Sequence, residues 1–546
     1  MEIALRSEVH TYSGGLGVLA GDTARSAADL NLPMVFVSLI SRDGYVRQEI
    51  GPNGGQIDHP NPWVPDEWAE PLSAMVAVPI GGRDVWIRPW LHLLSCPLGH
   101  SIPVILLDTD LDQNQPEDRA ITQRLYGGDD THRLKQEIVL GIGGMLLLRA
   151  LGFKIGVYHL NEGHAALLTL QLLRETGYPA EALAPNKTFY DRHSVRERCV
   201  FTTHTPVEAG FDRFDYDLVS RLLGESADMT ELKELGGSDR LNMTQLALNL
   251  SGYVNGVAQR HAETARRMFP GYQIRSITNG VHAHTWTHRA FAKLYEAKFP
   301  NWAHEPEVLA TADQIPDQEI WAAHQEAKTD LLTRVQNATG TQMRPDIPLI
   351  GFARRMAGYK RPDLLFSEID RLRQIARARP FQIVLAGLAH PSDGPGKRLI
   401  EDLHAHIGQM SDTLPIAFLP GYDMSLAAAF VSGCDIWLNT PMPPLEASGT
   451  SGMKAALNGG LNLSVLDGWW VEGCVDGVTG WPIAGDPAGS GDGVALYDRL
   501  ERDVLPLYYD DRPRWIWMMK QAICKIGPVF NSQRMMRRYA AEAYLR

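Results

Sequence analysis

The sequence has few cysteines, no excess of basic residues and no long hydrophobic run. Its five cysteines, Cys96, Cys199, Cys434, Cys474 and Cys524, are scattered over 546 residues without a CxxC spacing. This pattern indicates a reduced, cytoplasmic protein, and it argues against a structural zinc site. No cluster of His and Cys with the spacing of metal ligands occurs, so we expect no metal.

Membrane and nucleic-acid partners are also unexpected. The longest apolar stretch, Ile138–Leu151, is rich in glycine and is typical of a buried helix rather than a membrane span. The first residues, Met1–Arg6, are too short and too charged for a signal peptide. A formal net charge of −12 argues against a general nucleic-acid binder, although it leaves room for a local basic pocket that binds a phosphate.

A chain of 546 residues is too long for one hydrophobic core. Short apolar runs alternate with helical stretches, which predicts parallel sheets with right-handed βαβ crossovers. We expect an α/β protein with two Rossmann-like domains that face a central cleft, at residues 1–300 and 301–530. The proline-containing segment Phe299–Asp317 would connect them, and an amphipathic helix at residues 531–546 is able to pack back across the junction.

Polar residues follow several predicted strands directly. Asn161–His164 comes after the strand Ile155–Leu160, and His204 comes after the strand Arg198–Thr203. Open α/β sheets place their sites at such carboxyl ends, although a single histidine is also often a core or capping residue. The other expected strands are Met34–Ile40, Met75–Ile80, Val85–Leu94, Ile102–Leu107, Leu349–Phe352, Phe381–Gly387, Ile416–Leu419, Asp435–Leu438 and Leu461–Val465.

Two further segments suit anions. Four cations, Arg354, Arg355, Lys360 and Arg361, follow the strand Leu349–Phe352 within eight residues. On an acidic protein this favours an anion pocket over a solvated helix face. The glycine-rich segment Tyr12–Asp22 would let backbone amides approach a phosphate or a sugar, but such segments also serve as plain connections.

The segment Glu446–Gly460, EASGTSGMKAALNGG, combines a loop of small residues with a short helix. Thr450 or Ser451 is predicted to cap the helix, which carries Lys454 one turn later and stops at the asparagine and two glycines that follow. Exposed N–H groups at the helix start suit an anion. The alternative is a capped surface helix with a solvated lysine.

Together, several motifs resemble the α-glucan phosphorylases, the family of the glycogen, starch and maltodextrin phosphorylases. EASGTSGMKAALNG is similar to the family's pyridoxal phosphate lysine motif. SGGLG, LNEGH, TTHTPVEAGFDRF, VNGVA, TNGV followed by a tryptophan, GYKR and LPGYDMSLA also occur in the family's order, from about Tyr12 to Trp470.

The resemblance implies a GT-B fold and a retaining phosphorolysis. An α-1,4-glucan and inorganic phosphate would give a shortened glucan and α-glucose 1-phosphate, released from the non-reducing end. The cofactor would be pyridoxal 5′-phosphate, used through its phosphate group. The resemblance is also compatible with a homodimer.

It further implies roles for individual residues. Lys454 would carry the cofactor as a Schiff base, Lys360 and Arg355 would bind phosphates, and the His204 carbonyl would face developing positive charge. The cofactor's other neighbours would be Gly15, Thr450, Ser451, Tyr422 and Trp286. The glucosyl unit would be held by Leu16, Asn279, Glu446, Ser448 and Gly449, and His164 would lie among the substrate-binding residues.

The sequence departs from the long family members in places. Arg354 stands where many have Lys, Asp423 where they have Arg, and Leu388 where a Lys is common. Ser451-Gly452 is typical of short bacterial and archaeal members, and we expect the regulatory N-terminal region of animal enzymes to be missing. The alternatives are a nucleotide-sugar-dependent GT-B glucosyltransferase similar to glycogen or starch synthase, and a non-catalytic glucan-binding protein.

Overall fold

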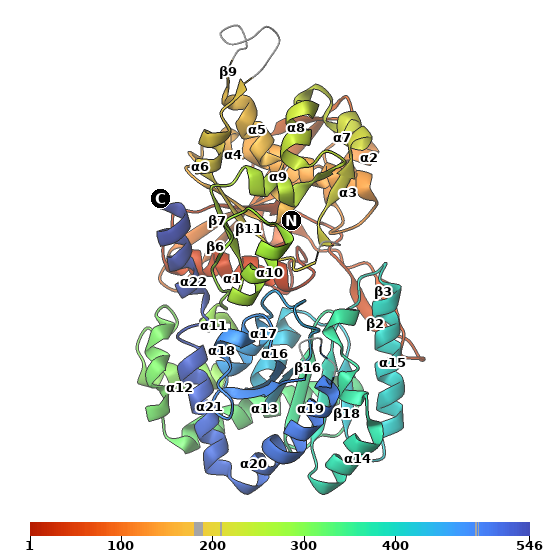
Figure 1. The fold of residues 1–546 in the computed structure, drawn as a ribbon, viewed down its shortest axis with the longest axis vertical. Helices are drawn as coiled ribbons and strands as arrows, with labels where there is room; N and C mark the ends of the chain where they lie inside the picture. The colour runs from red at the N-terminus through yellow and green to blue at the C-terminus, as the bar shows by residue number, and fades with distance from the viewer. Residues whose placement is uncertain (179–188, 208–209, 486–488, 490, 546) are drawn as a thin grey trace. The chain divides into compact units, whose positions relative to one another are not determined.

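The computed structural model describes residues 1–178, 189–207, 210–485, 489 and 491–545. The chain forms two compact units, shown together in Figure 1. Unit 1 comprises Met1–Tyr45, Pro60–Ile277 and Met536–Arg546, and unit 2 comprises Val46–His59 and Thr278–Met535. Two residues of the TTHTPVEAGFDRF motif, at positions 208 and 209, lie outside the described residues.

Unit 1 contains a parallel four-stranded sheet. Its order is β15 (Arg275–Ser276), β14 (Tyr253–Gly256), β11 (Cys199–Thr202) and β8 (Tyr158–Asn161). Every residue of β11 and β14 is buried, as expected for parallel strands covered on both faces. The sequence therefore predicted β8 and β11, whose carboxyl ends carry the polar clusters.

A second sheet of unit 1 is mostly antiparallel. β1 (Phe36–Leu39) pairs in parallel with β7 (Ser101–Asp108), but β6 (Arg83–Ser95) pairs antiparallel with β7, β5 (Val76–Ile80) and β4 (Glu70–Pro71). The prediction of βαβ units throughout is wrong here. Only residues 81–82 join β5 to β6 and residues 96–100 join β6 to β7, and such short links allow only antiparallel pairing.

Unit 2 is built on a buried, parallel six-stranded sheet. Its order is β18 (Ile416–Leu419), β17 (Gln382–Ala386), β16 (Leu349–Ala353), β19 (Ile436–Asn439), β20 (Leu461–Val465) and β21 (Gly480–Ile483). The sequence predicted all of these strands except β21. The strand order reverses between β16 and β19, and open α/β sheets bind ligands at this switch point.

Unit 2 begins earlier in the chain than the sequence prediction placed the second domain. The division lies between Ile277 and Thr278 rather than near residue 300. Helix α12 (Arg289–Lys298) packs on α13 (Asp317–Thr339), and Tyr295 donates a hydrogen bond to the Leu457 carbonyl at 2.7 Å. The hairpin of β2 (Arg47–Ile50) and β3 (Gln56–His59) also belongs to unit 2.

The end of the chain returns to unit 1. Helix α22 (Ser532–Tyr539) lies within the predicted amphipathic segment, and residues from Met536 onward group with unit 1. There, Tyr544 OH lies 2.7 Å from His159 Nδ1, and Tyr539 OH lies 3.0 Å from Asn255 Nδ2. These hydrogen bonds join the C-terminal segment to the parallel sheet.

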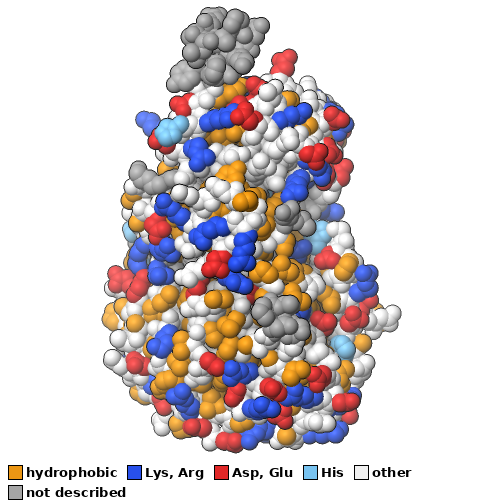
Figure 2. All heavy atoms as spheres, in the orientation of Figure 1, with side chains coloured by type: hydrophobic (Ala, Val, Ile, Leu, Met, Phe, Trp, Pro, Cys, Tyr) orange, Lys and Arg blue, Asp and Glu red, His pale blue; other side chains and the backbone are white. Residues whose placement is uncertain are grey.

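Among the residues that the structure describes, no helix is long and apolar enough to span a membrane. On the face of the molecule in Figure 2, Lys and Arg side chains are interspersed with Asp and Glu. No broad basic area appears on that face.

Candidate active site

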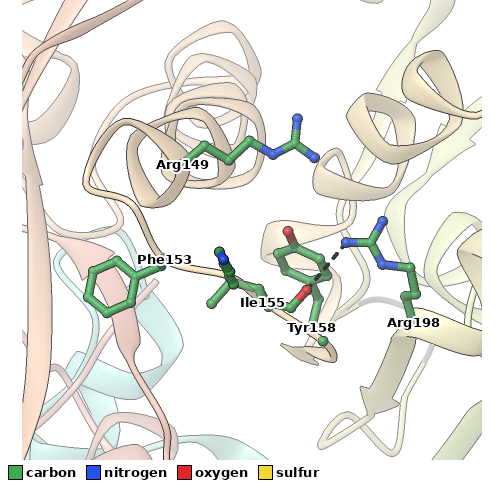
Figure 3. Close-up of a pocket in the computed structure, with 7 residues that line it drawn as sticks. Arg149, Phe153, Ile155, Tyr158 and Arg198 are labelled. Carbon is green, nitrogen blue, oxygen red and sulfur yellow. Dashed lines mark hydrogen bonds between the residues drawn. The ribbon is translucent and has the colours of Figure 1, made fainter.

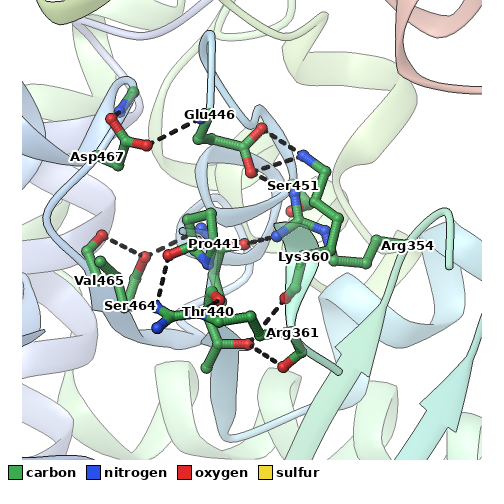
Figure 4. A network of polar contacts seen from close by, with 12 residues as sticks. Arg354, Lys360, Arg361, Thr440, Pro441, Glu446, Ser451, Ser464, Val465 and Asp467 are labelled. Carbon is green, nitrogen blue, oxygen red and sulfur yellow. Dashed lines mark hydrogen bonds and ion pairs between the residues drawn. The ribbon is translucent and has the colours of Figure 1, made fainter. Parts of the chain in front are cut away.

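The first cluster lies at the switch point of the unit 2 sheet. Arg354 follows β16 directly, and its guanidinium donates to the side chain of Asn439 at the end of β19 and to the carboxylate of Glu446 (Figure 4). A single arginine therefore joins the carboxyl ends of the two strands where the order reverses. The sequence placed Arg354 among the cations but gave it no role of its own.

Lys360 and Glu446 form the centre of this cluster. Lys360 Nζ lies 2.8 Å from each carboxylate oxygen of Glu446, and the two residues are 8% and 5% exposed. Burial alone would raise the pKa of Glu446, but the positive charges of Arg354 and Lys360 lower it to about 2. Glu446 is therefore an anion held between two cations at neutral pH.

The backbone of this loop is fixed as well. The Glu446 N–H donates to Asp467 Oδ2 at 2.8 Å, and Gly449 has a φ of +77°. A Cβ at Gly449 would lie 3.0 Å from Glu446 Cδ, so a side chain there would displace the carboxylate. The sequence missed Asp467, which no spacing relates to this loop.

The four cations do not all belong to the pocket. Arg361 donates to the carbonyls of Thr440 and Pro441 at 2.9 and 2.7 Å and pairs with Asp492 at 2.5 Å, so it anchors the chain after β19. Its inclusion in the anion pocket is wrong. Arg355 is exposed and makes no ion pair with the described residues, which leaves its guanidinium available to an anion.

Lys454 is buried against an indole ring. It lies on α17 (Ser451–Ala456), is 7% exposed, and its Nζ is 3.6 Å from the centre of the Trp286 ring. The Asn458 side-chain amide donates to the carbonyls of both Trp286 and Lys454, at 2.8 and 2.9 Å. The alternative of a solvated surface lysine is therefore wrong, because Lys454 is almost fully buried. Asn458, which follows the helix, joins the backbones of Lys454 and Trp286.

The predicted helix cap is absent. Thr450 is the N-cap residue of α17, but its side chain makes no capping hydrogen bond, and Ser451 Oγ accepts from Trp437 Nε1 at 3.0 Å. The backbone of Thr450 is already helical, with φ −73° and ψ −6°, and this directs its side chain differently from a capping residue. The helix also ends at Ala456, before the predicted stop signals.

Tyr422 lies beyond the carboxyl end of β18, two strands from β16 in the sheet. It follows β18 and donates from its hydroxyl to the Ala353 carbonyl at 3.3 Å. Since Ala353 is the last residue of β16, Tyr422 contacts the start of the cation loop.

Several buried polar atoms in unit 2 have no partner within the described residues. They include Ser448 Oγ, Asn279 Oδ1 and Arg354 Nε, and Ser448 and Asn279 are each only 4% exposed. Buried polar groups are rarely left unsatisfied in a folded protein. These orphaned atoms, with the cations and the buried Lys454, fit a polar, phosphate-bearing cofactor and a sugar.

Unit 1 carries a second polar cluster at the ends of β8 and β11. The Glu162 carboxylate accepts from the His204 N–H and from the hydroxyls of Thr203 and Thr205, the last two at 3.3 and 2.9 Å. His204 Nε2 is hydrogen-bonded to Asn161 Oδ1, and burial lowers the pKa of His204 to about 3. His204 is therefore neutral, and its backbone is fixed by Glu162, a role that the sequence did not assign.

The remaining predicted site residues of unit 1 are His164, two positions after Glu162, and Gly15 and Leu16 at the start of α1 (Gly15–Asp29). His164 is half-buried, the loss of solvent around its ring lowers its pKa, and its Nε2 is 3.8 Å from Asp212 Oδ2. Gly15 is exposed at the start of α1 and Leu16 is half-buried. A Cβ at Gly15 would meet no atom within 4 Å, so the space beside this backbone is open.

A cavity of about 380 Å³ in unit 1 lies at the opposite end of the parallel strands (Figure 3). It is lined at the amino ends of β8 and β11 by Tyr158 and Arg198. Its arginines are engaged: Arg198 donates to the Ile155 carbonyl at 3.4 Å, and Arg149 pairs with Glu175. No group of three or more His, Cys, Asp or Glu in the part of the chain that the structure describes suits a metal ion.

Comparisons with known proteins identify the family of the chain. The family model "Carbohydrate phosphorylase" matches residues 207–476. The whole chain aligns with a maltodextrin phosphorylase of Thermococcus litoralis at 39% identity, covering 70% of that protein. It also aligns over its whole length with glycogen phosphorylases of Mycobacterium tuberculosis, at 37% identity and 70% coverage, and of Aquifex aeolicus, at 34% identity and 85% coverage.

The parallel sheets and the strand-end clusters define the class first: an α/β enzyme of the glycosyltransferase type with the GT-B fold, built from two Rossmann-like domains. Within that class, the chain belongs to the carbohydrate phosphorylase family.

Proposed function

We propose that this protein is an α-glucan phosphorylase that depends on pyridoxal 5′-phosphate. It would cleave glycogen, starch or maltodextrin at the non-reducing end with inorganic phosphate and release α-glucose 1-phosphate with retention. The observation that supports this best is the buried Lys454, whose Nζ lies 3.6 Å from the centre of the Trp286 ring.

The unit 2 residues suit the cofactor. Lys454 would hold it covalently, Trp286 and Tyr422 would line its ring, and Thr450 and Ser451 would lie at its phosphate, together with Gly15 from unit 1. When bound, the cofactor supplies a phosphate monoester with a pKa of about 6, which can donate and accept a proton at neutral pH.

The same unit offers cations for the substrate phosphate. Two phosphates held side by side repel each other by roughly 4 kcal/mol for unit charges at 4 Å and an effective dielectric constant of about 20. Arg355 and Lys360 would offset this repulsion. Since Lys360 contacts both oxygens of Glu446 at 2.8 Å, it would share its charge between Glu446 and a bound phosphate.

The glucosyl unit would be held by a set of small and polar groups. Glu446 would accept hydrogen bonds from its hydroxyls, and the orphaned Ser448 Oγ and Asn279 Oδ1 would find partners on the sugar. The amide of Gly449 and residues Leu16 and His164 would complete the contacts. The His204 carbonyl, whose amide is held by Glu162, would stabilise positive charge at the anomeric carbon.

Reduction with borohydride tests the cofactor assignment. Treating the purified protein with pyridoxal 5′-phosphate and borohydride should attach a phosphopyridoxyl group to Lys454, detectable by peptide mass spectrometry. Lys454→Arg keeps a cation beside Trp286 but should give no adduct. Absence of the adduct in the wild-type protein, together with glucosyl transfer from a nucleotide sugar, would favour the synthase-like alternative.

A cytoplasmic location and a homodimer complete the proposal. The scattered cysteines support the first: three of the five, Cys96, Cys199 and Cys434, are buried as free thiols. Gel filtration with light scattering would test the second.

A further inference from the structure

The hairpin of β2 and β3 contacts the sheet of unit 2 through two glutamine side chains. Gln48 and Gln56 are its buried strand residues, 5% and 8% exposed, whereas Ile57 on the same hairpin is 42% exposed. A polar attachment of this kind is unusual, since elements normally bury apolar side chains. Its stability depends on the hydrogen bonds that the two amides make.

Gln48 connects two strand ends of the unit 2 sheet. Its Nε2 donates to the Gly387 carbonyl at 2.8 Å, just after β17, and its Oε1 accepts from the Gly421 N–H at 3.0 Å, just after β18. Nε2 also donates to Gln56 Oε1 at 2.9 Å. One side chain thus fixes the spacing of two loops.

The Gln56 side-chain amide makes two hydrogen bonds to the backbone of residue Ala389, in the loop after β17. Its Nε2 donates to the Ala389 carbonyl and its Oε1 accepts from the Ala389 N–H, both at 2.9 Å. Its second amide hydrogen reaches Asp58 Oδ1 at 2.7 Å, and Asp58 pairs with Lys397 at 2.5 Å. Residues 387–389 are therefore held on the hairpin by three hydrogen bonds.

The same loop supports the backbone of the cation cluster. The Leu388 carbonyl accepts from the Met356 N–H at 2.8 Å, and a Cβ at Gly387 would lie 2.0 Å from the Arg354 carbonyl oxygen. These contacts join the backbone of residues 354–356 to that of residues 387–389. Arg355 lies between the two contact points.

We propose that Gln48 and Gln56 are positioning residues for the phosphate-binding loop at Arg354–Lys360. They act through residues 387–389 and touch no substrate atom. This inference rests on the proposed function, because it takes that loop to bind the substrate phosphate. A segment near the beginning of the chain therefore sets the geometry of a site formed some 300 residues later.

Gln48→Met and Gln56→Met test this, with Ile57→Thr as the control on the exposed side of the same hairpin. Hydrogen exchange, measured with and without inorganic phosphate, reports on residues 353–360 and 387–389. Steady-state kinetics give the KM for phosphate and the KM for maltodextrin. Two glutamine variants are used so that the poor folding of one still leaves a test.

Both glutamine variants should exchange faster at residues 354–356 and lose protection by phosphate there. The KM for phosphate should rise by about tenfold, less than the roughly 100-fold cost of a 1 Å misplacement of reacting groups. Their KM for maltodextrin should stay unchanged. The Ile57→Thr control should match the wild type in hydrogen exchange and in both KM values.

Glutamine variants that are only less stable, with wild-type exchange at 354–356 and a wild-type KM for phosphate, would overturn the inference. Failure of the proposed function looks different: the wild-type protein would form no glucose 1-phosphate. The effect of phosphate on exchange would then still decide whether the glutamines position an anion site.

Discussion

Lys360 Nζ lies 2.8 Å from both carboxylate oxygens of Glu446, in a site where each residue is less than a tenth exposed. Arg354 binds the same carboxylate from the end of β16. One buried anion therefore holds two cations in place before any phosphate is bound. This arrangement explains how an acidic protein can keep a concentrated positive charge ready for a phosphate.

Replacing Glu446 with Gln should destabilise unit 2, because Arg354 and Lys360 would lose their buried counterion. Breaking one partner of a buried ion pair costs about 3–5 kcal/mol. Phosphate should restore part of this loss, so the melting temperature of Glu446→Gln should rise more with added phosphate than that of the wild type. Equal rises in both proteins would contradict the assignment of the two cations to phosphate.

The ion pair of Lys360 and Glu446 should make the free energy of unfolding depend on pH in the acid range. The pKa of Glu446 is about 2 in the folded protein. Its ordinary value, which applies to the unfolded chain, is 4.5, so the unfolded chain binds the proton more readily. The stabilisation is complete above pH 4.5 and is lost as the pH falls toward 2, by about 3 kcal/mol in total.

Urea unfolding at several pH values measures this term as the difference between the wild type and Glu446→Gln. The difference should be constant from about pH 5 to 7 and should shrink steadily below about pH 4.5. A difference that does not change with pH would mean that Glu446 is not held ionised in the folded state.

Arg355 and Arg361 should behave in opposite ways on substitution with Ala. Arg355 is exposed without an ion pair among the described residues, so its loss should leave stability within about 0.5 kcal/mol of the wild type and reduce phosphorolysis by about 100-fold. Arg361 anchors the Thr440 and Pro441 carbonyls, so Arg361→Ala should lower the melting temperature. Full activity of Arg355→Ala would show that the substrate phosphate binds elsewhere.

Glu162 in unit 1 should affect activity by holding the backbone of His204 in place. Glu162→Ala removes the acceptor of the His204 N–H and of two threonine hydroxyls, and we expect turnover to fall by about tenfold because unsatisfied buried donors cost about 1–3 kcal/mol. Glu162→Gln keeps one acceptor oxygen and should lose less activity. An equal loss for Gln and Ala would show that the retained acceptor oxygen does not help and that the charge of Glu162 is needed instead.

The local pattern of the sequence predicted the strands that carry both clusters, because buried parallel strands form apolar runs that end at polar residues. Its motifs singled out Lys454, Glu446 and Lys360, which the structure buries in unit 2 and whose roles remain predictions. It could not predict that Arg361 binds backbone carbonyls, since a run of cations looks the same whether its members face solvent, an anion or a neighbouring loop.

Contacts between distant segments were also beyond the sequence. Asp467 and Glu446 are 21 positions apart and Gln48 and Gly387 are 339 apart, and no periodicity relates them. The antiparallel sheet of unit 1 was missed because its strands have the same apolar character as parallel ones. Only the short links between them distinguish the two arrangements.

The most direct test of the account is phosphorolysis itself. The purified protein, supplied with pyridoxal 5′-phosphate, is incubated with maltodextrin and inorganic phosphate, and the products are separated and identified. We predict α-glucose 1-phosphate from the wild type and none from Lys454→Ala. No glucose 1-phosphate from the wild type, or equal amounts from both proteins, would contradict the central claim.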